Sequence, residues 1–251
     1  MTNQPALAVT ELALQIGGAR IINGVTLSVQ PGEMVGVIGP NGAGKTTLFN
    51  LISGVMAPTE GTVYFNGADV TRTPIHKRAR AGLGRTFQTS SLFPELSVTE
   101  NVRLAAQAAL GRSLSFLQFP HSKDEATTKA RECLEEVGLS GRLDTVAGVL
   151  SHGDKRKLEI AMLLAGNPTV ILLDEPMAGV GSADIPGLTE VIRHVHKAGR
   201  TVLMVEHHMD VVLGLVDRVA VMHHGQLLAF DTPDAVMANP IVQSAYLGET
   251  V

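Results

Sequence analysis

The sequence predicts an α/β fold with a mainly parallel core sheet, and two observations carry that prediction. Short apolar runs recur, each followed by a stretch with helical spacing, and these runs are "MVGVIG", "TVILLDEP" and "TVLMVEH". Continuous runs of Val, Leu and Ile are typical of strands buried on both faces of a parallel sheet. Helices between such strands indicate the α/β class. With 251 residues, 45% of them hydrophobic, the chain is long enough for one domain over residues 1–251.

A second kind of strand pattern appears near the N-terminus. The segments "ALAVTELALQI", "VTLSVQPGE" and "GTVYFNGADV" alternate between apolar and polar residues and are bounded by Gly, Pro and Asn. Alternation of this kind is typical of strands with one buried face. We therefore predict a small antiparallel β subdomain formed by about residues 6–30 and 61–70.

Two further segments have helical spacing. Residues from about 89 to 160 contain "SVTENVRLAAQAALGR" and "DEATTKARECLEEVGL", which predict a helical subdomain. Ser97 followed three residues later by Glu100 is a candidate capping box. Residues from about 228 to 251 are predicted to form a C-terminal helical segment, in which Thr232, followed by a proline, caps the first helix.

Composition excludes several classes of protein. The 20 basic and 24 acidic residues give a net charge of −4, whereas nucleic-acid binders are usually basic, so we expect no nucleic-acid partner. The one cysteine, Cys133, rules out an internal disulfide and is interpreted as a structural thiol. The N-terminus lacks the basic start of a secretory signal, and no window reaches about 18 uninterrupted apolar residues. Any membrane association would therefore require a partner.

The clearest chemical motif is "GPNGAGKT", which matches G-x-x-x-x-G-K-[ST] between a strand-like and a helix-like run. Glycines in such a P-loop let backbone N–H groups surround phosphates, and the helix N-terminus favours an anion. The lysine supplies charge to the β- and γ-phosphates, and the threonine hydroxyl binds Mg²⁺. The predicted ATP-binding residues of this motif are Gly39, Pro40, Asn41, Gly42, Ala43, Gly44, Lys45, Thr46 and Thr47.

Polar residues follow the next two apolar runs. Asp174 and Glu175 end the run "VILLDE". Asp174 would hold Mg²⁺ through a water molecule, and Glu175 would act as the general base that activates the attacking water. His207, which ends "TVLMVEH", is predicted to contact the γ-phosphate. Gln88, between the two predicted subdomains, is predicted to bind Mg²⁺ and to sense the γ-phosphate. A metal site at His207 and His208 is disfavoured because adjacent side chains at a strand end point in different directions.

The stretch "LSHGD" has two interpretations. Ser151 is a natural N-cap for the helix that follows, and it is also placed to offer a hydroxyl to a phosphate. The order of the P-loop, Gln88, "LSHGD", "LLDEP" and His207 resembles the nucleotide-binding subunit of ABC transporters over about residues 6–250. That resemblance implies a P-loop NTPase fold and a head-to-tail dimer. It also implies that the signature, Ser151, His152, Gly153 and Asp154, contacts the ATP held by the partner.

Three positions depart from the family pattern. Asp154 stands where Gln is usual and His152 where Gly is usual. A carboxylate about 6 Å from a phosphate would be repelled by about 3 kcal/mol per charge pair at an effective dielectric constant of about 20. We therefore expect Asp154 to point away from the phosphate. Ile16 stands where the family places an aromatic residue that stacks on adenine, so we expect weaker nucleotide binding or a looser choice of base.

Further segments resemble one branch of the family. "LEIAMLLAGNP", "VEHHMDVV" and "AYLGE" are similar to the ATPase subunits of branched-chain amino-acid importers, a branch shared with urea and amide importers. The resemblance implies an ATPase bound peripherally to the inner face of the cytoplasmic membrane. Its implied partners are two permeases, a second ATPase subunit (a copy of this chain or a sister protein) and, indirectly, a periplasmic binding protein.

The resemblance also implies a groove for a permease helix within residues 89–119, including Leu92, Phe93 and Phe116. From the residues alone, the segment "SLSFLQFPHSK" is either a surface loop or a docking surface. The alternatives to amino-acid import are a urea or amide importer ATPase, an exporter ATPase, and a soluble ABC ATPase with a single cassette.

Overall fold

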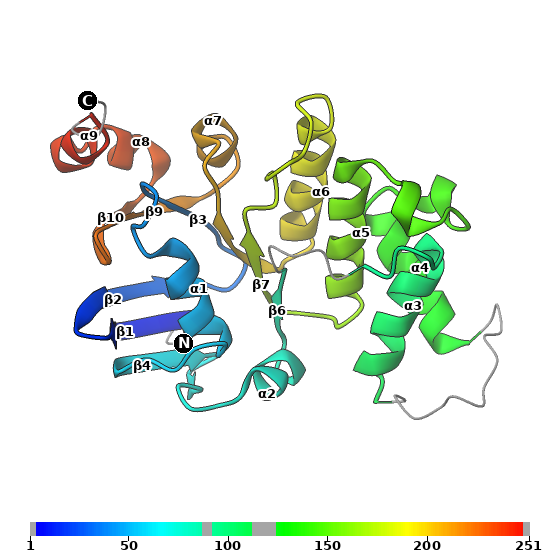
Figure 1. Cartoon of the computed structure of the whole chain (residues 1–251), viewed down its shortest axis with the longest axis horizontal. Coiled ribbons are helices and arrows are strands. Elements are labelled where there is room, and N and C mark those ends of the chain that lie inside the picture. The colour runs from blue at the N-terminus through cyan, green and yellow to red at the C-terminus, as the bar shows by residue number, and fades with distance from the viewer. Residues whose placement is uncertain (1–3, 87–91, 112–123, 248–251) are drawn as a thin grey trace.

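The computed structural model describes residues 4–86, 92–111 and 124–247, and its core is a six-stranded sheet (Figure 1). The strand order in that sheet is β10-β9-β3-β8-β7-β6, with β10 antiparallel to β9 and the other neighbours parallel. This mainly parallel sheet confirms the predicted α/β class. Its strands are β3 (Met34–Ile38), β6 (Leu83–Arg85), β7 (Val170–Asp174), β8 (Thr201–Val205), β9 (Arg218–His223) and β10 (Gln226–Asp231).

The three central strands, β3, β8 and β7, are buried along their whole length. Successive side chains of a strand point to opposite faces, so each strand feeds two hydrophobic cores. In β7, Ile171 and Leu173 belong to one core, and Val170 and Leu172 belong to the other. Both faces therefore need apolar residues, which is why the sequence shows continuous apolar runs rather than alternation.

The N-terminal part of the chain forms a second, antiparallel sheet, as its alternating segments predicted. Its strand order is β2-β1-β4-β5. The strands are β1 (Leu7–Ile16), β2 (Ala19–Val29), β4 (Glu60–Phe65) and β5 (Ala68–Asp69). Helix α1 (Lys45–Ser53) shares one hydrophobic core with both sheets, and Leu48, Phe49 and Ile52 are fully buried there.

The helices are distributed on both sides of the main sheet. Helices α3, α4 and α5 lie together beyond β6 and β7, next to α6 (Figure 1). Ser97 caps α3 as predicted, because its Oγ accepts a hydrogen bond of 3.2 Å from the N–H of Glu100. The bounds are α2 (Ile75–Arg80), α3 (Val98–Ala109), α4 (Glu125–Glu136), α5 (His152–Leu164), α6 (Ile185–Lys197), α7 (Met209–Leu213), α8 (Pro233–Met237) and α9 (Pro240–Leu247).

The C-terminal segment differs from its prediction at one end. Residues 228–231 were expected in a helical segment but lie in β10. The cause is the turn between β9 and β10, where His224 and Gly225 have φ values of 46° and 77°. Two consecutive residues with positive φ suit a two-residue hairpin turn, so the chain folds back as a strand. Beyond the strand, Thr232 caps α8 as expected.

Within the described residues, none of the helices is both long enough and apolar enough to cross a membrane.

Candidate nucleotide-binding site

The main sheet brings the predicted site residues together at one edge. Strands β3, β8 and β7 are parallel neighbours, so the segments after their carboxyl ends meet. The P-loop follows β3, Asp174 ends β7 and is followed by Glu175, and His207 follows β8. A cavity of about 270 Å³ lies between these segments. Its described lining is Ile21, Asn41, Gly42, Ala43, Gly44, Lys45, Thr46, Thr47, Glu175 and His207.

Glycines set the path of the P-loop. Gly39 has φ = 151°, and a Cβ atom added there would lie 2.1 Å from the carbonyl oxygen of Met222 on β9. Gly44 caps α1 in the left-handed conformation at φ = 96°. Both positions therefore exclude a side chain, one by contact and the other by backbone conformation. The result is a glycine-rich loop directly ahead of the N-terminus of α1, a position that favours an anion.

Lys45 is the first residue of α1, at the end of the loop. Its ammonium group is largely buried and donates hydrogen bonds to the carbonyl oxygens of Gly39 (2.6 Å) and Pro40 (2.9 Å). Burial lowers the pKa of Lys45, and the negative charge of Glu175 opposes that shift. The loop thus holds the lysine beside its own glycines, where a phosphate group would meet it.

Glu175 has an unusual backbone. Its φ of 49° lies in the left-handed region, which is rare for residues other than Gly and Asn and often marks functional sites. The Glu175 N–H donates to the carbonyl oxygen of Val205 at 3.0 Å, and this bond ties β7 to β8. The Glu175 side chain points to the histidine, with Oε1 at 3.0 Å from Nε2 of His207. A carboxylate and an imidazole thus lie in contact on the wall of the cavity.

Asp174 is 1% exposed and has one oxygen in an ion pair. Oδ2 accepts a bond of 2.8 Å from Arg85 on β6, whereas the buried Oδ1 has no hydrogen-bond partner among the described residues. Burial raises the pKa of Asp174, and the Arg85 guanidinium opposes that rise. An unpaired buried carboxylate oxygen and the hydroxyl of Thr46 are ligands of the hard-oxygen kind that Mg²⁺ prefers. The residues present therefore fit a magnesium ion.

Not every sequence-predicted site residue is found at this cavity. Gln88 lies outside the described residues. Ile16 ends β1 with 52% of its surface exposed and is not part of the cavity lining described above. Ser151 caps α5, where its Oγ accepts a 3.2 Å bond from the N–H of Asp154. Ile21 also lines the cavity, from β2, although it lies in no recognisable sequence motif.

The predicted signature residues are separate from the cavity that the P-loop lines. Among the described residues, none from Ser151 to Asp154 lines that cavity. Helix α5 begins at His152 and lies on the opposite side of β7 from α1 (Figure 1). Gly153 is buried against α6, because a Cβ atom there would lie 2.6 Å from Cβ of Asp184. One chain therefore holds the P-loop and the signature at two distinct places on its surface.

Comparison with known proteins identifies the family. The sequence model described as "ABC transporter" matches residues 22–178, which is more than half of the chain. The chain belongs to the ABC transporter ATP-binding family. A second model, described as "Branched-chain amino acid ATP-binding cassette transporter", matches residues 226–251. The ABC family consists of ATP-binding, ATP-hydrolysing cassettes, so this chain is an ATPase.

Curated relatives and solved structures agree with this assignment. The chain is 39% identical to the high-affinity branched-chain amino acid transport ATP-binding protein BraF of Pseudomonas aeruginosa, over 98% of this chain and 99% of that protein. It is 39% identical to LivG of Escherichia coli K12, with the same coverage of each chain. An ABC transporter cassette in its ADP conformation has a TM-score of 0.86 and 33% identity, covering 98% of this chain and 99% of that one. A dimeric post-hydrolysis cassette bound to ADP and Pi has a TM-score of 0.75 and 25% identity, covering 90% and 98%.

Asp154 of the ABC ATPase signature has cationic partners. Its Oδ2 lies 3.2 Å from Nε of Arg142, and its Oδ1 lies 3.7 Å from Nζ of Lys157. Asp154 is also in the first turn of α5, where a negative charge is favourable to the helix dipole. These contacts support the hypothesis that the carboxylate points away from a phosphate.

Replacing Asp154 with Gln should change the affinity of the ATP-bound dimer by less than about fivefold, because ion pairs near the surface contribute about 0–1 kcal/mol. The variant should also melt about 1–3 °C lower, since the loss of a charge at a helix N-terminus costs about 0.3–1 kcal/mol. Sedimentation in saturating ATP measures the first effect, and a melting curve measures the second. Asp144→Asn, at an exposed site, is the control. Tightening of the dimer by more than tenfold would show that Asp154 repels the nucleotide.

Proposed function

We propose that this ABC ATPase energises the uptake of a small polar or amino-acid-like solute, and that the solute is a branched-chain amino acid. The observation that carries the solute class is the match of residues 226–251, from β10 to the C-terminus, to the branched-chain amino acid cassette model. Near-complete alignment with BraF and LivG supports the same class. The chain then acts at the inner face of the cytoplasmic membrane, where it is held by permease subunits.

The geometry of the cavity supports a mechanism for hydrolysis. The P-loop N–H groups and Lys45 bind the β- and γ-phosphates of ATP. Glu175 accepts the proton of the attacking water as general base. His207, in contact with Glu175 at 3.0 Å, orients the γ-phosphate relative to that base. The barrier falls because base, phosphate and water are held in position before reaction.

The chain offers oxygen ligands for a magnesium ion. Thr46 and Asp174 would hold it, together with Gln88. When bound, Mg²⁺ neutralises negative charge on the phosphate oxygens. Arg85 keeps Asp174 oriented through the 2.8 Å ion pair, which leaves Oδ1 available for the ion or its water.

A dimer would complete the site. The phosphate cavity of one chain lacks the signature, as far as the described residues extend, and Ser151 to Asp154 lie at a separate place. We infer that two cassettes associate head to tail, so that the signature of one closes over the ATP of the other. The hydroxyl of Ser151 and the N–H groups of His152 and Gly153 then face the γ-phosphate of the partner's ATP. The second cassette is a copy of this chain or a sister ATPase.

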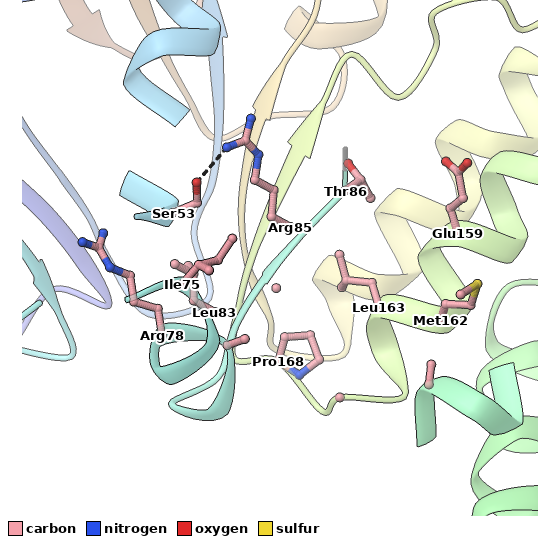
Figure 2. A pocket seen from close by; sticks show the side chains of 14 residues that line it. Ser53, Ile75, Arg78, Leu83, Arg85, Thr86, Glu159, Met162, Leu163 and Pro168 are labelled. Atoms are coloured by element: carbon pink, nitrogen blue, oxygen red, sulfur yellow. Dashed lines mark hydrogen bonds between the residues drawn. The ribbon is translucent and has the colours of Figure 1, made fainter. Parts of the chain in front are cut away.

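A groove beside the edge strand β6 suits a permease segment. A mostly apolar cavity of about 370 Å³ lies between α2, β6 and the C-terminal half of α5 (Figure 2). Figure 2 shows Ile75, Leu83 and Pro168 beside Leu163 and Met162 around it.

The groove overlaps little with the stretch 89–119 expected from sequence. Of the described part of that stretch, Ala105 lines this groove, and Leu92 lines a neighbouring cavity of about 460 Å³. Phe93 is 51% exposed beside Leu92, and Phe116 lies outside the described residues. We therefore place the main docking contact on α2, β6 and α5.

The solute and the partners can be tested together. The chain is tagged in its host, recovered from salt-washed membranes in mild detergent and reconstituted in vesicles with whatever membrane proteins accompany it. The binding protein of the system is then added with leucine, urea or acetamide. ATP hydrolysis stimulated by leucine supports the proposal, and stimulation by urea or acetamide alone favours the amide importer. Recovery from the cytosol with ribosomes, or without partners, favours the soluble ATPase.

Replacing Ile16 with Tyr should tighten ATP binding. Ile16 is 52% exposed at the end of β1, so the substitution leaves packing of the core unchanged. Stacking of an aromatic ring on a base contributes about 1–3 kcal/mol, which corresponds to a gain of about 5- to 150-fold in affinity. Calorimetric titration measures the affinity for ATP, and Ile16→Leu, which lacks an aromatic ring, is the matched control. Equal ATP affinities of the Ile16→Tyr and Ile16→Leu variants would show that residue 16 does not contact adenine.

A further inference from the structure

Glu206 is a buried carboxylate that contacts the two loops carrying Glu175 and His207. Glu206, directly after β8, is 2% exposed and accepts hydrogen bonds at both oxygens. Oε1 accepts a 2.6 Å bond from the N–H of Met177. Oε2 accepts a 3.0 Å bond from the N–H of His207 and lies 3.2 Å from Nδ1 of His208.

These bonds join the two loops that carry the chemistry. Met177 is two residues beyond Glu175, so the bond to Oε1 holds the turn in which Glu175 adopts its left-handed φ of 49°. A rare conformation of this kind persists only when its surroundings enforce it. The bond to Oε2 holds the backbone of His207, whose Nε2 lies 3.0 Å from Glu175 Oε1. Glu206 thus closes a ring of contacts through both loops.

We propose that Glu206 is a positioning residue for ATP hydrolysis, whose carboxylate joins the loop after β7 to the loop after β8 and so fixes Glu175 relative to His207. This inference rests on the proposed roles of Glu175 and His207. A carboxylate is required because two backbone N–H donors meet two different oxygens. An amide offers one acceptor, so glutamine would place its NH₂ group against one of the two N–H groups.

The first test is Glu206→Gln, which preserves size and removes one acceptor. The expected result is a fall in kcat of at least about tenfold, with less than about a threefold change in the Kd for ATP, because the P-loop is untouched. Glu136→Gln is the matched control, since Glu136 is a part-buried carboxylate paired with Arg200 away from the cavity. An unchanged kcat in a folded Glu206→Gln protein would overturn the proposal.

A double-mutant cycle separates positioning from general destabilisation. If Glu206 acts through Glu175, adding Glu206→Gln to Glu175→Gln should slow hydrolysis by less than about twofold further. Multiplication of the two separate effects would overturn the proposal. Glu206→Asp, which keeps both acceptors but shortens the side chain, serves if the Gln variant does not fold, and the same non-additive cycle is expected for it.

The proposed role of Glu175 is checked by its own single variant. Near-normal hydrolysis by Glu175→Gln would refute the mechanism on which the inference rests. Slow hydrolysis by Glu175→Gln together with normal hydrolysis by Glu206→Gln would refute the inference alone.

Discussion

Replacing Glu175 with Gln should leave ATP bound and slow its hydrolysis by about 10²- to 10⁴-fold, the range that a positioned general base contributes. The substitution removes the proton acceptor while keeping the size of the side chain and its backbone bond to Val205. The ATP-bound dimer should then accumulate, because hydrolysis no longer reopens it.

Two measurements check this expectation. Release of phosphate at saturating ATP gives the rate, and gel filtration with ATP gives the population of dimer. Glu190→Gln, which removes an exposed carboxylate on α6, is the matched control. Turnover within a few-fold of the unmodified protein would exclude Glu175 as the base and would direct attention to His207.

Replacing Lys45 with Met should weaken ATP binding by about 10- to 150-fold, because hydrogen bonds to charged groups contribute about 1.5–3 kcal/mol. Methionine matches the length of the lysine side chain but offers neither charge nor donors. The loop carbonyls of Gly39 and Pro40 also lose their partner, so the P-loop itself should become less well ordered.

Calorimetric titration with ATP measures the loss of affinity, and a melting curve without nucleotide measures the change in the loop. Lys197→Met, at an exposed position near the end of α6, is the matched control. Unchanged affinity together with a lower melting temperature would mean that Lys45 organises the loop and does not bind the phosphates.

The fold was largely predictable because its determinants are local in sequence. Continuous apolar runs predicted the buried strands β3, β7 and β8, since residues such as Ile171 and Leu172 face different cores and both must be apolar. The hairpin of β9 and β10 was missed. Its turn uses a left-handed histidine, His224, where a stronger turn signal would be Asn or Asp before glycine.

The sequence indicates the motif residues of the candidate site, but it does not indicate the long-range contacts that hold those residues in place. The P-loop residues and Glu175 could be singled out because they stand in motifs of fixed spacing, and the structure brings them to one cavity. Arg85 and Asp174 are 89 residues apart, and Glu206 and Met177 are 29 apart, so no local pattern predicts that they meet. Ile21 was also missed, because an isoleucine on a strand carries no chemical signal.

The buried thiol on α4 has a practical consequence for spectroscopy. Cys133 is the single cysteine of the chain and is 1% exposed, and burial raises its pKa to about 11. Because the thiolate is the reactive form, maleimide reagents should leave this group unmodified at neutral pH. One cysteine introduced at an exposed position, such as Val149 just before the signature, should therefore take a fluorophore or spin label without removal of the native residue. Distances between two such labels would then follow the opening and closing of paired cassettes during turnover.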